Sequence, residues 1–212
     1  SIFGAFIKHD MRKGFPIITT KKSAFKTFVA ETLWFLKGST NVNELRALAH
    51  GEENRFNNNK KTVWDANYEQ QGIAERGYSY GYTGPIYGKQ WRDFNESGLD
   101  QIKYIIDEAT ENPGSRRLLV TSWNPLQINE MILPPCHSFF QINIEDEYID
   151  LQWYQRSSDL FLGAPANVLN YSILLSILGR ILNKTPRYLS MSIGDAHIYN
   201  NHILKEHLLY QF

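Results

Sequence analysis

The chain has 212 residues, of which 42% are hydrophobic and 14% aromatic, which is enough to bury a sizeable core in one domain over residues 1–212. Its 22 basic and 22 acidic residues cancel, so no overall field favours nucleic acid or an anionic membrane. A single cysteine excludes a disulfide framework and a multi-cysteine metal site, and fits a reducing compartment such as the cytoplasm. Polar residues interrupt each apolar stretch before about 18 residues, so we expect no membrane span.

Helices are predicted in the first half of the chain. Apolar residues recur at helical spacing over residues 25–36, and Gly38 can end that helix. A second helix is predicted over 99–109. The runs 57–61 and 77–84, rich in Asn and Lys or in Gly and Tyr, are typical of loops.

Strands dominate the second half of the chain. The predicted elements are a strand at 117–123, a hairpin of 140–144 with 149–153, a helix at 167–182, a strand at 188–193 and a helix from 198 onward. The strands cluster instead of alternating strictly with helices. This order favours an α+β fold in which helices pack on a mixed sheet.

Cys136 is a candidate nucleophile. It follows two prolines and precedes a predicted strand, so few backbone conformations are open to it. A lone cysteine is most often a small buried hydrophobe, and its neighbours decide between the two readings. Cations that could stabilise its thiolate are offered by His137, Arg156 and the pair Arg116 and Arg117.

The arginines suggest a local anion site. Arg156 lies where the apolar alternation of a strand ends, and there a guanidinium can reach a phosphate. Arg116 and Arg117 open another strand, although such a pair is usually solvated surface. Local arginines in a chain of zero net charge suit a small phosphorylated ligand better than a polyanion.

Asn167 lies immediately before the long predicted helix and has two readings. Asn is among the best N-cap residues, so the first reading is structural. An amide also presents a donor beside an acceptor, which matches the N3–H and O4 of uracil. The second reading makes Asn167 a base-recognition residue.

Residues 194–202 place several polar groups in a strand-to-helix turn. His197 and His202 are five apart and have no nearby cysteine, so we expect no metal. Hydrogen bonding to a sugar by His197 and Tyr199 is the favoured reading. A capping role for Asp195 and a packed Tyr199 are the alternatives.

Glu31 lies at the edge of the apolar stripe of the first helix. Partial burial there would raise the pKa of its carboxyl and suit proton transfer near neutrality. A surface glutamate is the alternative. Trp64 and Tyr87 are either core aromatics or the walls of a site for a flat ring.

Five segments in one order resemble the thymidylate synthase family. They are 31–36 (ETLWFL), 84–92 (GPIYGKQWR), 115–117 (SRR), 133–141 (LPPCHSFFQ) and 155–167 (QRSSDLFLGAPAN), the last leading on to 194–202 (GDAHIYNNH). The resemblance spans nearly the whole chain. It implies an α+β fold, a homodimer formed through sheets, and reductive methylation of deoxyuridine monophosphate (dUMP) by 5,10-methylenetetrahydrofolate.

The resemblance also implies a role for each matching residue. Cys136 would add to C6 of the base. The other implied roles are phosphate binding by Arg156 and Ser157 with Arg116 and Arg117 of the partner subunit, sugar binding by His197 and Tyr199, uracil recognition by Asn167, proton transfer by Glu31, Tyr87 and His137, and contacts of Trp64, Asp159 and Gly163 with the folate, Asp159 also bordering the substrate.

Some positions depart from the family pattern. The family's N-terminal arginine loop should precede Ser1 and its folate-closing tail should follow Phe212, so we expect both to be missing. Ala166 replaces a usual phenylalanine, which keeps open a deoxyuridylate hydroxymethylase in which water quenches the methylene. Asn167 argues against a deoxycytidylate version. A non-catalytic nucleotide- or RNA-binding homologue is the third reading, against which the retained Cys136 counts.

Overall fold

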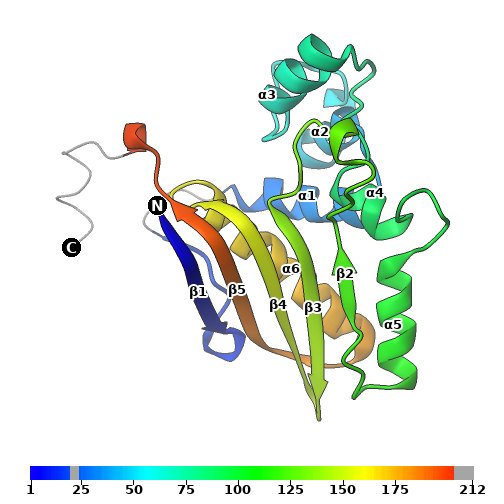
Figure 1. Cartoon of the computed structure of the whole chain (residues 1–212), viewed down its shortest axis with the longest axis vertical. Coiled ribbons are helices and arrows are strands. Elements are labelled where there is room, and N and C mark those ends of the chain that lie inside the picture. Colours follow the sequence, from blue (N-terminus) through cyan, green and yellow to red (C-terminus); the bar gives the residue numbers. More distant parts are fainter. Residues whose placement is uncertain (20–23, 203–212) are drawn as a thin grey trace.

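The structure is a computed structural model that describes residues 1–19 and 24–202 (Figure 1). Within these residues the strands form a five-stranded sheet of order β1-β5-β4-β3-β2. The strands are β1 (Ile2–Asp10), β2 (Leu119–Thr121), β3 (His137–Glu145), β4 (Tyr148–Asp159) and β5 (Thr185–His197). β4 and β5 pair in parallel and the other neighbours are antiparallel. The expected α+β class with a mixed sheet is confirmed.

Within the described residues, helices cover one face of this sheet and leave the other face open (Figure 1). The α-helices are α1 (Phe25–Leu36), α2 (Val42–His50), α3 (Asp65–Asn67), α4 (Tyr87–Arg92), α5 (Gln101–Glu111) and α6 (Gly163–Leu182). α6 lies behind the sheet in Figure 1, where it contacts β4, β5 and α1. Trp153 of β4 stacks on Tyr171 of α6 with ring centroids 4.5 Å apart. Because strand side chains alternate, Tyr154 points to the open face.

α6 is the one described helix whose length and composition would allow it to cross a membrane. From the sequence we expected polar residues to interrupt every apolar stretch too early for a membrane span. By length and composition this helix does not meet that expectation. Half of its most apolar window is buried against the rest of the chain. Leu174, Leu175 and Leu178 belong to the hydrophobic core, so α6 has the character of a core helix.

Several predicted elements differ in extent from the observed ones. α1 begins and ends where it was predicted, whereas β5 extends beyond the predicted strand 188–193 at both ends. β1 and α2 were not predicted. Of the helix expected from 198 onward, Asn200–His202 forms a 3-10 turn, and residues 203–212 lie outside the described part.

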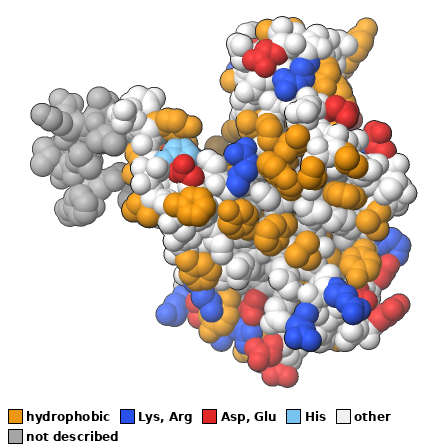
Figure 2. Space-filling view, viewed as in Figure 1, with side chains coloured by type: hydrophobic (Ala, Val, Ile, Leu, Met, Phe, Trp, Pro, Cys, Tyr) orange, Lys and Arg blue, Asp and Glu red, His pale blue; other side chains and the backbone are white. Residues whose placement is uncertain are grey.

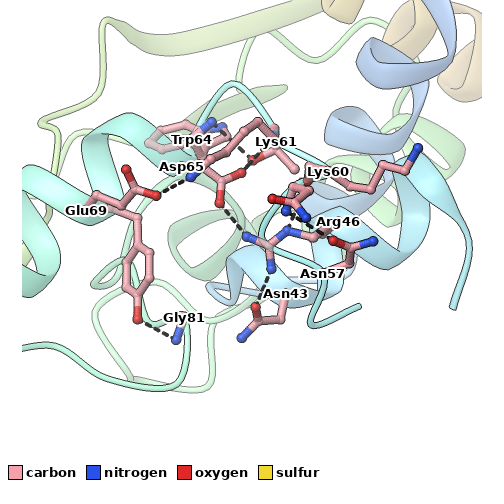
Figure 3. A network of polar contacts seen from close by, with 12 residues as sticks. Asn43, Arg46, Asn57, Lys60, Lys61, Trp64, Asp65, Glu69 and Gly81 are labelled. Carbon is pink, nitrogen blue, oxygen red and sulfur yellow. Dashed lines mark hydrogen bonds and ion pairs between the residues drawn. The ribbon is translucent and has the colours of Figure 1, made fainter. Parts of the chain in front are cut away.

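A buried ion pair holds the loop between α2 and α3 (Figure 3). The guanidinium of Arg46 in α2 pairs with Asp65, and both side chains are less than 5% exposed. Arg46 also donates to the Lys60 carbonyl at 3.1 Å, and Asp65 accepts from the Thr62 hydroxyl at 2.7 Å. These bonds fix the chain on either side of Trp64, which is itself buried.

Candidate active site

Cys136 lies just before β3, with its thiol partly exposed. Its backbone N–H donates to the hydroxyl of Tyr87 in α4 at 2.8 Å. Its carbonyl accepts from the backbone N–H of Arg156 in β4, also at 2.8 Å. Both main-chain groups of the candidate nucleophile are therefore fixed by separate elements, as the two preceding prolines suggested.

Arg156 is the cation that faces the thiol. Its Nε donates to the Pro135 carbonyl at 3.0 Å and its Nη2 to the Pro134 carbonyl at 2.9 Å. Nη2 lies 3.8 Å from the Cys136 Sγ. Burial raises the pKa of the Cys136 thiol, and the positive charge of Arg156 opposes that effect.

His137 does not supply a second cation. Burial lowers the pKa of its imidazole to about 3, so the ring is neutral at pH 7. Its Nδ1 lies 2.9 Å from the Tyr171 hydroxyl, and its ring stacks on Tyr87 with centroids 4.1 Å apart. A neutral imidazole can donate one hydrogen bond and accept another, which fits a place in a proton-transfer network.

Glu31 lies inside the protein, which excludes the surface reading. Its carboxylate accepts a hydrogen bond from the Trp64 indole at 2.6 Å and another from the Asn170 amide at 2.5 Å. Burial raises the pKa of the carboxyl, and these two donors oppose the rise. The Trp64 ring lies 6.0 Å from that of Tyr87, so Glu31 belongs to the same aromatic cluster as the Cys136 loop.

Asn170 was missed in the sequence, although an amide in the middle of a core helix was a signal.

The N-cap reading of Asn167 is wrong, because α6 already begins at Gly163 and Leu162 occupies the cap position. Asn167 lies inside the helix, one turn before Asn170, and is half-buried. Its side chain is therefore free of a capping duty.

The ends of β4 and β5 bring four predicted site residues together. The parallel register places Ser157 beside Asp195 and Asp159 beside His197. The rings of His197 and Tyr199 meet edge to face, 5.0 Å apart. Tyr199 is 56% exposed, which excludes the packed-core reading.

Gly163 and Asp159 are neighbours at the start of α6. A Cβ added to Gly163 would lie 3.7 Å from the Asp159 Cβ. The side chains of Leu160 and Leu162, in the turn between β4 and α6, are both exposed. The Asp159 carboxylate, the Gly163 backbone and the apolar side chains of the turn therefore lie close together.

Arg116 and Arg117 do not join the Cys136 cluster of their own chain. Both are exposed and precede β2. Because Leu119 pairs with Gln141, Arg117 lies level with a point about seven residues along β3 from Cys136, or roughly 20 Å away. Within one chain, these arginines are at the wrong end of the sheet for a common anion site.

Over the described ranges 1–19 and 24–202, no group of three or more His, Cys, Asp or Glu side chains is placed to hold a metal ion. His197 instead approaches Asp195, with its Nδ1 3.3 Å from a carboxylate oxygen.

The chain is similar to known proteins over most of its length. Residues 1–210 match the family model for thymidylate synthase. The chain is 49% identical to the thymidylate synthase of Enterobacteria phage T4, over 96% of the chain and 68% of the phage protein. It is 48% identical to a probable thymidylate synthase of Escherichia phage T5, over 96% of the chain and 71% of that protein.

A crystal structure gives the same result for the fold. The structure of thymidylate synthase from T4 phage superposes with a TM-score of 0.91 and 47% identity, covering 100% of this chain and 71% of the other. The family model and these relatives each match most of the length of the chain. The chain therefore belongs to the thymidylate synthase family.

Proposed function

We propose residue roles for the reaction that family membership assigns to this enzyme, the methylation of dUMP to thymidylate with 5,10-methylenetetrahydrofolate. The observation that carries the proposal is the fixed Cys136 loop with Arg156 beside the thiol. A thiol in such a setting suits covalent catalysis better than simple ligand binding. The chemistry supplied by the bound folate is a one-carbon unit together with a hydride.

Cys136 adds to C6 of the uracil ring, and Arg156 with Ser157 holds the phosphate of the nucleotide. The 3.8 Å approach of the guanidinium to Sγ supports this pairing, because the same charge favours the thiolate and attracts the phosphate. A catalytic thiol must stay reduced. We accordingly propose a cytoplasmic location.

Asn167 recognises the uracil edge, while Glu31, Tyr87 and His137 move the proton lost from C5. Asn167 is supported by its freedom from capping and its half-buried place on α6. The proton-transfer group is supported by contact: His137 stacks on Tyr87, and the buried Glu31 lies in the same aromatic cluster. Burial keeps all three groups away from competing solvent.

His197 and Tyr199 bind the sugar hydroxyl, and Asp159 borders both the sugar side and the folate. The edge-to-face contact of the two rings beside the end of β4 supports the first role. The folate fits beside Asp159 and Gly163, where the exposed Leu160 offers apolar surface for a flat ring. Trp64 lies nearer to Glu31, and we assign to it the inner wall of the folate site. None of these roles requires a metal.

We propose that the active form is a homodimer joined through the open face of the sheet. Hydrophobic side chains gather over the strands on that face (Figure 2), and a cavity of about 410 Å3 opens there between Trp123, Phe139 and Tyr154. Leu119 and Phe139 are each more than 35% exposed in the single chain. Covering such a surface favours a second copy.

In the proposed dimer, Arg116 and Arg117 can bind the phosphate in the active site of the partner subunit. Because they lie roughly 20 Å from Cys136 along their own sheet, a phosphate site that includes them takes them from the partner. We expect the double variant Arg116→Glu/Arg117→Glu and the single variant Cys136→Ala each to be inactive when expressed alone. Co-expressed in equal amounts, they should regain about a quarter of wild-type activity, because half of the dimers are mixed and each mixed dimer has one complete site. A mixture no more active than its parts would contradict donation across the interface.

Product analysis tests the reaction itself. Protein is incubated with dUMP and 5,10-methylenetetrahydrofolate, the nucleotide is identified by mass spectrometry, and dihydrofolate is followed by absorbance. We expect thymidylate and dihydrofolate in equal amounts. If the products are a hydroxymethyl nucleotide and tetrahydrofolate, the assigned reaction is hydroxymethylation and not methylation. If neither nucleotide product forms, the assignment as an enzyme is contradicted.

A further inference from the structure

The Glu31 carboxylate is held between two hydrogen-bond donors from different elements. Trp64 approaches from the loop before α3 and Asn170 from the middle of α6. Each occupies a different carboxylate oxygen. We infer that Asn170 is a positioning residue, whose amide fixes the direction in which Glu31 presents its remaining lone pairs to the proton it transfers. The inference rests on the proposed function for the role of Glu31.

The geometry gives the Asn170 amide a defined orientation. A carboxylate only accepts hydrogen bonds, so the amide turns its NH2 group toward Glu31, at 2.5 Å. Its carbonyl then faces the Thr32 hydroxyl, 3.4 Å away. Both Asn170 and Glu31 are buried, so water does not compete for either group. Such a charge-assisted bond is among the stronger ones in a protein.

The groups that surround the pocket do not balance the charge of Glu31. Tyr87 of α4, His137 of β3 and Tyr171 of α6 are neutral at pH 7, because burial raises the pKa of both tyrosines and lowers that of the histidine. Asp65, beside Trp64 on the remaining side, is paired with Arg46. The ionised form of Glu31 therefore depends on the donors of Trp64 and Asn170.

Asn170 also connects Glu31 to the nucleophile's surroundings. A cavity of about 10 Å3 is lined by Thr32, Asn170, His137 and Tyr171, together with apolar residues. The amide thus lies on a wall shared by the carboxylate and by the histidine that follows Cys136. A residue that served only to fill space at this place would need no amide.

The pH profile separates positioning from packing. Removing the amide in Asn170→Ala removes a donor to the ionised carboxylate, so the pKa of Glu31 rises and the acidic limb of kcat moves to higher pH. We expect a shift of about one pH unit, seen as roughly tenfold lower kcat on the acidic side and recovery on the basic side. KM for dUMP should change little. A purely structural loss would lower kcat equally at all pH values.

Two further variants sharpen this test. Asn170→Ser keeps a shorter hydrogen-bond donor at this position and should have a profile between those of wild type and Asn170→Ala. It also keeps the question open to measurement if the alanine variant does not fold. Ser172→Ala is the matched control, since Ser172 is buried in the same helix and donates to the Val168 carbonyl at 2.7 Å. It should leave the acidic limb in place.

A measurement that needs no turnover tests the same inference. The infrared band of the protonated Glu31 carboxyl, identified by its loss in Glu31→Gln, is titrated in wild type and in Asn170→Ala. We expect its midpoint to rise by about one pH unit in the variant. An unchanged midpoint, a uniform loss of kcat, or an equal shift in Ser172→Ala would overturn the role of Asn170. If wild type makes no thymidylate, the proposed function fails, while the titration still decides whether Asn170 controls the carboxyl.

Discussion

Cys136→Ala should abolish covalent capture of 5-fluorodeoxyuridylate in the presence of folate and lower kcat on the order of 10⁴-fold or more. The substitution removes Sγ and its 3.8 Å contact with Arg156 Nη2. The hydrogen bonds of Tyr87 and Arg156 to the backbone of residue 136 do not depend on the thiol and should remain. The loop should consequently keep its shape, and dUMP should still bind. Denaturing mass spectrometry detects the adduct, and calorimetry measures the nucleotide affinity.

Cys136→Ser is the matched control for this experiment. A hydroxyl keeps the size and polarity of the side chain but is a far weaker nucleophile than a thiolate. We expect normal nucleotide binding and almost no adduct. Equal capture by wild type and Cys136→Ala would remove Cys136 from the chemistry, whereas a loss of binding in both variants would make the thiol a structural group.

Arg46→Met should lower the free energy of unfolding by about 3–5 kcal/mol. The change leaves Asp65 as an uncompensated charge in a place where its side chain is 4% exposed. It also removes the hydrogen bond that Arg46 donates to the Lys60 carbonyl, which joins the loop carrying Trp64 to α2. Urea unfolding followed by fluorescence and by far-UV circular dichroism measures the loss.

Two controls show whether burial causes that effect. In the double variant Arg46→Met/Asp65→Leu no charge is left unpaired, so much of the lost stability should return. Lys103→Met breaks the exposed pair with Asp107 on α5 and should have little effect, since solvent screens that pair. A double variant no more stable than Arg46→Met would contradict the unpaired-charge explanation.

The sequence was most informative where local signals and tertiary packing agree. α1 was predicted at its observed bounds because its apolar residues recur at the helical period. β1 was missed because its pairing with β5 joins residues nearly 200 positions apart, and most of its side chains are exposed. Exposure removes the inside-outside alternation by which a strand is recognised.

The candidate site divides in the same way. Cys136 and Arg156 stand in a local pattern of prolines and strand ends, and the structure brings them together. Asn170 could not be linked to Glu31, because the two lie 139 residues apart and meet only when α6 packs on α1. The misreading of Asn167 arose from the helix boundary, since three small residues and a proline hid the first turn of α6.

Arg156 can fasten the nucleophile loop and receive an anion at the same time. A guanidinium carries five N–H donors, and the carbonyls of Pro134 and Pro135 engage one on Nη2 and one on Nε. Nη2 also approaches the Cys136 Sγ, so the two N–H groups on Nη1 are the ones left for an anion. The side chain is already held in one conformation. A phosphate arriving there would meet a preorganised partner and lose less affinity to side-chain ordering. Lysine at this position could attract the phosphate as a point charge, but it lacks the fork needed to grip the loop as well.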